Sequence, residues 1–378
     1  MRMLVTGSRV GRRPDTVPAD VGRLHRSLRG YRPTPLTLCR DLAERWGAAQ
    51  VAVKVEGDRW GLPSFKVVGT TWAVTEALRD HVPADWSAAD GLEALRGRLP
   101  DLTLAAASEG NHGEALAFVA RLVGLRCRVY VSEEVADGVV RRVQAQGAEV
   151  VSVPGTYDDA VAACAATGDQ QVVVSDTSWP SYERVPRAVA TGYSTILREA
   201  SDQLARTDFP AVDLVVVPIG VGALASAVVD HAATGPGPAP RIVGIEPAAA
   251  ACVMASLAAD RILTLPGPLA SPLSGLNCGT PSLVAWPRLR EGLAAVVALD
   301  DDEARIGSAR AAEAGLAVGP CAGAVVAAAG LLLSGPGATE RRSMLDLPEH
   351  PSVLLLATDG PRLPEPGPVQ LTEESTSA

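Results

Sequence analysis

The chain has 378 residues, of which 47% are hydrophobic and 20% charged, with a formal net charge of −9 at pH 7. This apolar content excludes a chain that is disordered throughout, and the length is enough for two or three domains around a large core. The negative charge and the aromatic content of only 4% argue against a nucleic-acid-binding surface.

The composition also predicts a cytoplasmic protein without a signal peptide or a membrane span. Two long uncharged runs, 262–287 and 314–339, are interrupted by prolines, and the second is expected to be a buried helix with its loops. The six cysteines have no C-x-x-C pair and the five histidines are scattered, which favours reduced thiols and no metal site.

Short apolar runs alternate with helix-like stretches along most of the chain. Because the runs lack polar alternation, they predict strands buried on both faces, in parallel sheets flanked by helices. The expected strands are 51–54, 102–106, 128–131, 149–153, 172–174, 214–218, 241–245 and 353–357. The clearest expected helices are 113–123, 137–146 and 223–233.

The order of these elements predicts two lobes. A small domain is expected at 90–190, inserted into a larger domain made of 1–89 and 191–378. Residues 1–30 are rich in arginine and are predicted to form an N-terminal arm. Residues 364–378 are rich in Pro, Glu, Ser and Thr and are predicted to be a disordered tail.

Only two of the 34 basic residues are lysines, Lys54 and Lys66. Lysine can lose its proton and form a carbon–nitrogen double bond, and arginine cannot. Lys66 follows Ser64-Phe65 and opens a predicted helix, where burial and the helix N-terminus are expected to lower its pKa. Lys54 lies in a strand pattern, which favours a structural ion pair with an acidic neighbour.

Three further segments carry polar or glycine-rich patterns next to predicted strands. In Ser108–Gly113, Asn111 offers a neutral hydrogen-bond donor, whereas His112 is either a base or, as the pattern favours, a packing residue. In Pro218–Ala225, the backbone N–H groups predict a phosphate site, although the spacing also fits a dinucleotide fingerprint with Glu246 on the ribose. Cys321, after Gly319-Pro320, is either a buried small residue or a weak partner for a ring nitrogen.

Together these segments resemble the fold-type II pyridoxal-phosphate enzymes, and within them the diaminopropionate ammonia-lyases. The resemblance covers roughly residues 30–360 in consistent order. Its marks are Tyr31-Arg32-Pro33-Thr34-Pro35-Leu36, Phe65-Lys66, Gly110-Asn111-His112-Gly113, Asp176-Thr177-Ser178-Trp179 and the segment from Gly275 to Ser282. It implies a fold like that of the tryptophan synthase β-subunit, with pyridoxal 5′-phosphate in the large domain, and a homodimer.

The resemblance also implies roles for individual residues. Lys66 would bind the cofactor aldehyde covalently, Asn111 would hydrogen-bond its phenolic oxygen, and Cys321 would face its pyridine nitrogen. The backbone of Gly220, Val221, Gly222, Ala223 and Leu224 would hold the phosphate.

Two acidic residues complete the implied site. Asp176 would bind the leaving amine or give it a proton, and its alternative reading from the sequence is a helix N-cap. Glu109 stands where the family normally has Asp, the base for a D-substrate. Its extra methylene moves the carboxylate by roughly 1 Å, which bears on the substrate and its chirality.

The implied reaction is an α,β-elimination from 2,3-diaminopropionate, or a related β-substituted amino acid, giving pyruvate and ammonia. The alternatives on the same scaffold are a serine or threonine dehydratase, a β-replacement synthase and a specialised biosynthetic variant. A binding protein that keeps the fold without activity is the alternative from another class.

Overall fold

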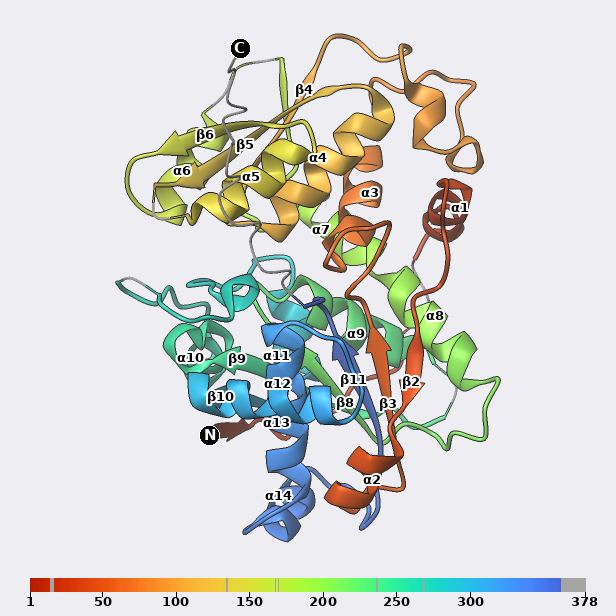
Figure 1. Ribbon diagram of the computed structural model, residues 1–378, viewed down its shortest axis with the longest axis vertical. Coiled ribbons are helices and arrows are strands. Elements are labelled where there is room, and N and C mark those ends of the chain that lie inside the picture. The colour runs from red at the N-terminus through yellow and green to blue at the C-terminus, as the bar shows by residue number, and fades with distance from the viewer. Residues whose placement is uncertain are drawn as a thin grey trace, which may run out of the picture.

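The computed structural model contains two β-sheets, each flanked by helices (Figure 1). It describes residues 1–13, 17–133, 135–166, 168, 170–235, 237–267 and 269–361, so the predicted tail at 364–378 lies outside the described residues. In Figure 1 the four-stranded sheet is in the upper part and the seven-stranded sheet in the lower part.

The four-stranded sheet is parallel throughout and has the order β6-β5-β4-β7. Its strands are β4 (Thr103–Ala107), β5 (Arg126–Ser132), β6 (Glu149–Val153) and β7 (Gln171–Val173). Its helices are α4 (Asn111–Val123), α5 (Asp137–Ala145) and α6 (Tyr157–Ala165). Alternate residues of β4 face opposite sides: Leu104 packs in the cluster that contains α4, and Ala105 in the cluster that contains α6.

The seven-stranded sheet has the order β1-β10-β9-β8-β11-β3-β2. The five inner strands are parallel, and the two edge strands, β1 and β2, run antiparallel to their neighbours. The strands are β1 (Arg2–Val5), β2 (Leu36–Leu38), β3 (Gln50–Val55), β8 (Leu214–Pro218), β9 (Arg241–Pro247), β10 (Ala295–Leu299) and β11 (Ser352–Ala357).

Helices cover both faces of this larger sheet. Residues of β8 alternate between a cluster that includes α9 and one that includes α13, so these two helices lie on opposite faces. The remaining helices are α1 (Ala19–Ser27), α2 (Arg40–Trp46), α3 (Lys66–Ala77), α7 (Arg184–Gly192), α8 (Ser194–Leu204), α9 (Ala223–Thr234), α10 (Cys252–Ala258), α11 (Trp286–Gly292), α12 (Asp301–Glu313), α13 (Pro320–Leu333) and α14 (Ala338–Met344). Short 3₁₀ turns are η1 (Ala88–Asp90), η2 (Leu92–Leu95), η3 (Ala248–Ala250) and η4 (Ser274–Leu276).

Every strand and helix that the sequence predicts is present, and three strands were missed. The predicted N-terminal arm contains β1, which pairs with β10, and helix α1, so much of it belongs to the fold. The missed edge strands are only four and three residues long. The third, β10, is an apolar run that periodicity alone does not distinguish from a buried helix.

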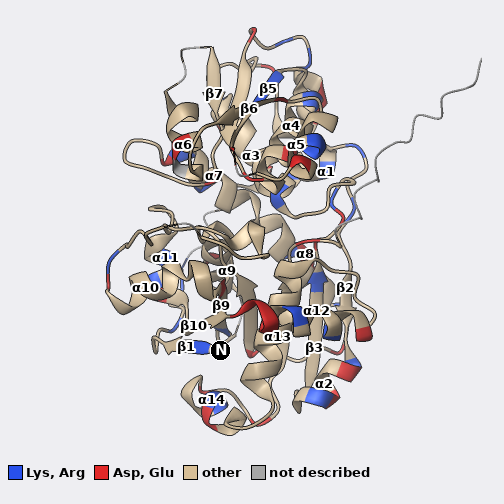
Figure 2. Cartoon of the chain, turned by 60° about the vertical axis from the view of Figure 1, so that its left-hand side comes forward, with Lys and Arg blue, Asp and Glu red and all other residues tan. Residues whose placement is uncertain are grey.

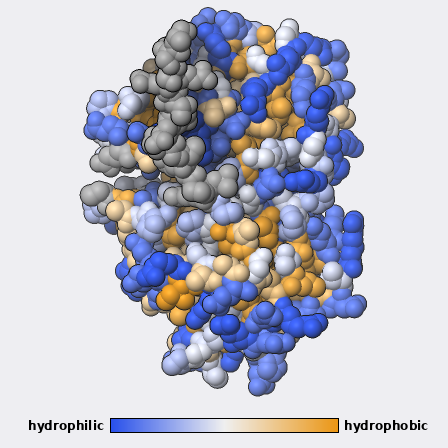
Figure 3. Space-filling view, in the orientation of Figure 1, coloured by the Kyte–Doolittle hydropathy of each residue, from blue (hydrophilic) through white to orange (hydrophobic). Residues whose placement is uncertain are grey.

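Helix α13 is apolar on all sides and nearly all of its residues are buried, as the sequence predicts for this run. Among the described residues no single helix has the length and apolar composition to cross a membrane, and the pair α13 and α14 that would together suffice is bent by 98°. Charged residues of both signs are spread over both parts of the molecule (Figure 2), and the face in Figure 3 mixes hydrophilic and hydrophobic residues.

Candidate active site

Because the strands within each sheet are parallel, apart from the edge strands β1 and β2, several loops at the carboxyl ends of the parallel strands lie together between the two sheets. Strands β4, β7, β8 and β11 end at 107, 173, 218 and 357. The first three precede polar or glycine-rich segments noted in the sequence, and β11 is followed by Thr358-Asp359-Gly360. Ligands of open α/β sheets bind outside the carboxyl ends of the strands. Helix α3 also starts here, at Lys66, and lies with α7 between the two sheets (Figure 1).

Lys66 is placed by hydrogen bonds between the segment before it and the segment after β11. The Phe65 N–H donates to Thr358 O at 3.2 Å, and the Gly360 N–H donates to Pro63 O at 3.0 Å. Ser64 and Asp359 also form a β-bridge. The last strand of the large sheet therefore fixes where helix α3 begins.

Lys66 and Asp176, which are 110 residues apart in sequence, form an ion pair. The Lys66 Nζ donates to Asp176 Oδ2 at 2.6 Å, and the side chains are only 18% and 11% exposed. Burial alone would raise the pKa of Asp176, but the nearby charges, first that of Lys66, hold it far below its usual range. The structure thus places Asp176 beside the lysine, and it is not an N-cap, since the next helix starts at Arg184.

The pKa predicted for Lys66 was wrong in direction. Burial lowers it, as expected, but the Asp176 carboxylate more than offsets burial and raises the pKa above its usual value. The helix start and the apolar neighbours of Lys66 are local in the sequence, whereas the family resemblance placed Asp176 in the same site without indicating an ion pair with Lys66. In this structure the amine is therefore a paired ammonium group.

His112 lies next to this pair and is fixed from the other side. Its Nε2 lies 2.7 Å from Val174 O, and its Nδ1 lies 4.0 Å from Asp176 Oδ2 and 3.5 Å from the Thr70 hydroxyl. Because Nε2 must carry a proton to bond a carbonyl, the ring connects the start of α4 to the segment that holds Asp176. This geometry agrees with the packing role that the sequence favours.

The side chains of Asn111 and Cys321 both lie close to Gly275 of η4. A Cβ atom built on Gly275 would lie 3.5 Å from Cys321 Sγ and 4.0 Å from Asn111 Nδ2. The absence of a side chain at Gly275 therefore leaves both groups accessible to a flat ligand. The neighbouring Asp359 accepts hydrogen bonds from the Cys321 N–H at 3.2 Å and the Ala322 N–H at 2.8 Å, so this acid caps α13.

The turn from β8 into α9 presents unpaired backbone donors. In the part of the chain that the structure describes, none of the N–H groups of residues 220–224 donates to a protein acceptor. Gly220 faces Gly275 of η4 and Cys278, which lies two residues after η4. A Cβ built on Gly220 would lie 3.1 Å from both Gly275 O and Cys278 Sγ. Free N–H groups at the start of a 12-residue helix suit an anion.

Glu109 is held at the end of β5. The Ser132 hydroxyl donates to Glu109 Oε1 at 3.1 Å. Cys278 lies near Glu109 and the Lys66–Asp176 pair. Burial raises the pKa of its thiol to about 12, and the charges of Lys66, Asp176 and Glu109 also act on this thiol. Cys278 therefore lies within electrostatic reach of all three predicted catalytic residues.

A cavity of about 300 Å³ opens beside these groups. Thr177 and Ser178 line it on one side, and Val221 and Cys278 on the other. The hydroxyl of Ser178, one of the lining residues, lies 2.7 Å from that of Ser282, which ties the segment after Asp176 to the loop after η4. Most of the exposed lining of the cavity is apolar, with side chains such as Trp179 and Leu283.

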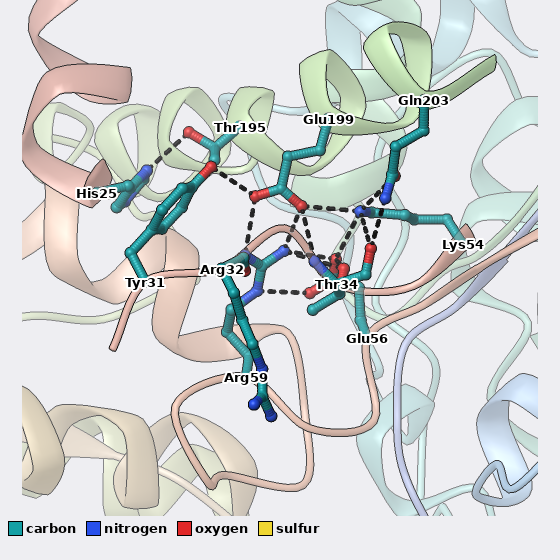
Figure 4. A network of polar contacts seen from close by, with 10 residues as sticks. All are labelled: His25, Tyr31, Arg32, Thr34, Lys54, Glu56, Arg59, Thr195, Glu199 and Gln203. Atoms are coloured by element: carbon teal, nitrogen blue, oxygen red, sulfur yellow. Dashed lines mark hydrogen bonds and ion pairs between the residues drawn. The ribbon is translucent and has the colours of Figure 1, made fainter. Parts of the chain in front are cut away.

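The second lysine, Lys54, has a different environment, shown in Figure 4. Its Nζ donates to Glu199 at 2.8 Å, to Thr34 O at 2.8 Å and to Gln203 at 3.0 Å, which uses all three protons. Arg59 bonds both Glu199 and Glu56, so two cations and two anions form one buried network. The predicted structural ion pair of Lys54 is confirmed.

The dinucleotide alternative is wrong, because Glu246 is not available to a ribose. Its carboxylate is fully buried and accepts hydrogen bonds from the N–H groups of Val253 at 2.7 Å and Met254 at 2.8 Å. Burial raises its pKa to about 7. Glu246 is a buried cap for the segment that starts α10.

Sequence reasoning missed Tyr193, whose buried ring lies 4.7 Å from that of Phe65, and did not assign functions to Gly275 and Ser132. Gly275 lay within a segment that the family resemblance marks. Tyr193 and Ser132 carried no local signal, because only the packing of distant segments brings them to the site.

Comparison with known proteins decides the family. A family model described as "Pyridoxal-phosphate dependent enzyme" matches residues 28–345. The chain belongs to this family. Its cofactor is pyridoxal phosphate.

The relatives include a diaminopropionate ammonia-lyase from Salmonella typhimurium, 30% identical over 305 residues, which are 78% of this chain and 76% of that protein. A biosynthetic L-threonine dehydratase from Corynebacterium glutamicum is 30% identical over 225 residues, or 60% of this chain and 46% of that protein. Diaminopropionate ammonia-lyase from Escherichia coli, solved in complex with an aminoacrylate-PLP azomethine reaction intermediate, superimposes with a TM-score of 0.84 at 25% identity. That match covers 95% of this chain and 93% of the other.

The residues present fit this cofactor. The free N–H groups of 220–224 suit its phosphate, and the buried amine of Lys66 suits its aldehyde. Asn111 and Cys321, which both lie close to Gly275, supply polar groups for its ring.

Proposed function

We propose that this protein is a pyridoxal-phosphate-dependent carbon–nitrogen lyase. It removes the β-amino group of 2,3-diaminopropionate, or the β-substituent of a related amino acid, by α,β-elimination. Water then hydrolyses the released enamine, so that diaminopropionate and water yield pyruvate and two molecules of ammonia. The observation that carries the proposal is the buried Lys66–Asp176 pair at 2.6 Å, since it combines an amine nucleophile with a carboxylate for a departing amine. The similarity to diaminopropionate ammonia-lyases supports the same reaction.

Four groups of this chain hold the cofactor in this proposal. Lys66 binds it covalently, Asn111 donates to its phenolic oxygen, and the N–H groups of Gly220, Val221, Gly222, Ala223 and Leu224 bind its phosphate. Cys321 lies at its ring nitrogen, where a thiol is a weak partner and does not hold a positive charge as a carboxylate would. When bound, the group stabilises negative charge at the substrate Cα.

The proton transfers fall to Lys66, Asp176 and Glu109. The freed Lys66 Nζ takes the proton from Cα of an L-substrate, and the Glu109 carboxylate takes it from the opposite isomer. Asp176, which holds an ammonium group in this structure, binds the departing β-amino group or gives it a proton. The largely apolar cavity beside Thr177 and Cys278 gives the substrate a water-poor approach.

A second candidate is a serine or threonine dehydratase, or a β-replacement synthase, with the same residues. The threonine dehydratase relative supports this candidate, and the glutamate at position 109 favours a specialised biosynthetic variant. A β-hydroxyl or other leaving group would then replace the β-amino group. A specialised biosynthetic enzyme of this kind would use an added nucleophile.

The test has two parts. The purified protein should be yellow, borohydride should fix the colour covalently, and the labelled peptide should contain Lys66. The 2-oxo acid should then be assayed with 2,3-diaminopropionate, serine and threonine separately, each with and without a thiol or amine nucleophile. Product from diaminopropionate alone supports the lyase, whereas a colourless protein without product from any substrate contradicts the proposal.

We further propose a cytoplasmic homodimer that binds neither nucleic acid nor membranes, with a small domain at 90–190 between the two parts of the large one. The location of β4 to β7 in one sheet, separate from the other seven strands, supports this division. Light scattering measures the mass of the particle, and limited proteolysis locates the domain boundaries.

A further inference from the structure

Tyr193 has a buried hydroxyl group that the fold leaves unused. The residue lies between α7 and α8 and is 1% exposed. Its hydroxyl has no hydrogen-bond partner among the residues that the structure describes. A buried hydroxyl without a partner destabilises a fold relative to phenylalanine at the same place. The stability of this structure therefore does not explain why residue 193 carries a hydroxyl group.

Two glycines let the Tyr193 ring reach helix α3. A Cβ atom on Gly69 would lie 2.5 Å from Tyr193 Cε1 and 2.7 Å from Cζ, the carbon that carries the hydroxyl. A Cβ atom on Gly192 would lie 2.9 Å from the Gly69 Cα. Helices α3 and α7 thus cross in backbone contact, and the ring passes over α3 three residues after Lys66.

The Phe65 ring lies close to both the Tyr193 ring and the Lys66 amine. The Phe65 ring centroid lies 4.7 Å from that of Tyr193 and 5.6 Å from Lys66 Nζ. Burial raises the pKa of Tyr193 well above its usual value, while the charge of Lys66 lowers it and that of Asp176 raises it. At neutral pH the hydroxyl is therefore protonated, and both charges of the pair act on it.

Asp176 needs another donor each time Lys66 leaves it. Besides Tyr182, whose hydroxyl donates to Val173 O, the titratable groups that interact with its carboxylate are Lys66, His112, Cys278 and Tyr193. His112 holds its Nε2 proton on Val174 O, and its Nδ1 is 4.0 Å away, beyond hydrogen-bond distance. A thiol such as Cys278 is a weak donor. Tyr193 alone among these four has a strong and uncommitted O–H donor.

We propose that Tyr193 is the reserve hydrogen-bond donor of Asp176, and that it donates to this carboxylate whenever the Lys66 amine is engaged elsewhere. Tyr193 is then a positioning residue, which acts through Asp176. In the present structure the Lys66 Nζ donates to Oδ2 of this carboxylate, and the Tyr193 hydroxyl has no partner among the described residues. This inference rests on the proposed function only in that Lys66 leaves Asp176 during the reaction.

A double-mutant cycle in the cofactor-free protein tests the proposal without any assay of activity. Tyr193→Phe should leave the unfolding midpoint of the parent protein unchanged or higher, because no hydrogen bond is lost. In the Lys66→Met protein, where the carboxylate has lost its ammonium partner, the same change should shift the unfolding equilibrium about tenfold towards the unfolded state. Equal effects in both backgrounds would overturn the proposal.

Tyr182→Phe is the matched control for stability. The Tyr182 hydroxyl donates to Val173 O at 2.8 Å and accepts from the Ser175 N–H at 2.9 Å, so its removal should lower the unfolding midpoint of the parent protein. If Tyr193→Phe lowers that midpoint as much as Tyr182→Phe does, the Tyr193 hydroxyl is structural and the proposal fails.

A second measurement uses the holoenzyme and does not depend on the Lys66→Met protein folding. Without its reserve donor, Asp176 should hold its proton more tightly, so the acidic limb of kcat in Tyr193→Phe should move up by about one pH unit. An unchanged limb with an unchanged kcat would overturn the proposal. Because borohydride labelling of Lys66 tests the proposed function separately, failure of one result is distinguishable from failure of the other.

Discussion

Lys54 Nζ lies 2.8 Å from a carboxylate oxygen of Glu199, and both side chains are buried between β3 and α8 (Figure 4). The pair belongs to the network that also contains Arg59 and Glu56. Burial lowers the pKa of Lys54, and hydrogen bonds and charge from Arg59 outweigh burial to lower that of Glu199. The network holds the end of β3 and the turn that leads to Lys66.

The first prediction concerns this network. Lys54→Met should lower the free energy of unfolding by about 3–5 kcal/mol, because it leaves a buried carboxylate without one of its cations. The exposed pair Arg187–Glu183, at 2.7 Å, is the control, and Arg187→Ala should cost less than about 1 kcal/mol. Urea denaturation of the cofactor-free protein measures both. A loss no larger at Lys54 than at Arg187 would show that the network contributes little.

The second prediction concerns Lys66. Lys66→Ala should be nearly inactive, with general base catalysis alone accounting for ~10²- to 10⁴-fold of the rate. Lys66→Arg keeps the positive charge beside Asp176 but cannot form a carbon–nitrogen double bond with an aldehyde, so it should be equally inactive. Steady-state production of 2-oxo acid measures both variants. Wild-type turnover in either one would rule out the proposed scheme.

The sequence predicted the parts of this molecule that depend on local pattern. Apolar runs located eight strands, and a lysine at a helix start located Lys66, because strand burial and helix starts leave local traces. The Lys66–Asp176 ion pair joins residues 110 positions apart, and its effect on the lysine pKa could not be inferred from neighbours in the chain. The unpaired hydroxyl of Tyr193 depends on the crossing of two helices at Gly69 and Gly192. Tertiary packing decides both features.

The third prediction concerns pH. The pKa of Asp176 is lowered by folding, so its contribution to stability is present above its unfolded value, about 4, and is lost as the pH falls further. The pKa of Lys66 is raised, so its contribution is present below its unfolded value, about 10.4, and is lost only as the pH rises through the higher folded value. The ion pair should therefore stabilise the cofactor-free protein between about pH 4 and 10.

Asp176→Asn should remove this stabilisation across the whole range, and the difference from the parent should shrink below about pH 4. The variant should also bind pyridoxal phosphate covalently at lower pH than the parent, because Lys66 loses its proton more easily without the carboxylate. Unfolding curves and the growth of cofactor absorbance, each followed against pH, measure these effects. A parent and variant with the same pH dependence would contradict the ion pair.

The last prediction concerns Glu109, which the Ser132 hydroxyl holds at 3.1 Å. Glu109→Asp shortens the side chain by one methylene and moves the carboxylate by roughly 1 Å, a displacement large enough to change rates by as much as ~10²-fold. If Glu109 is the base for one isomer only, this change should alter kcat for D-2,3-diaminopropionate at least tenfold and leave kcat for the L-isomer within about twofold. Ser132→Ala keeps the glutamate and removes the hydrogen bond, so a smaller change of the same D-to-L ratio is expected. Equal effects of Glu109→Asp on both isomers would show that Glu109 does not act as an isomer-specific base.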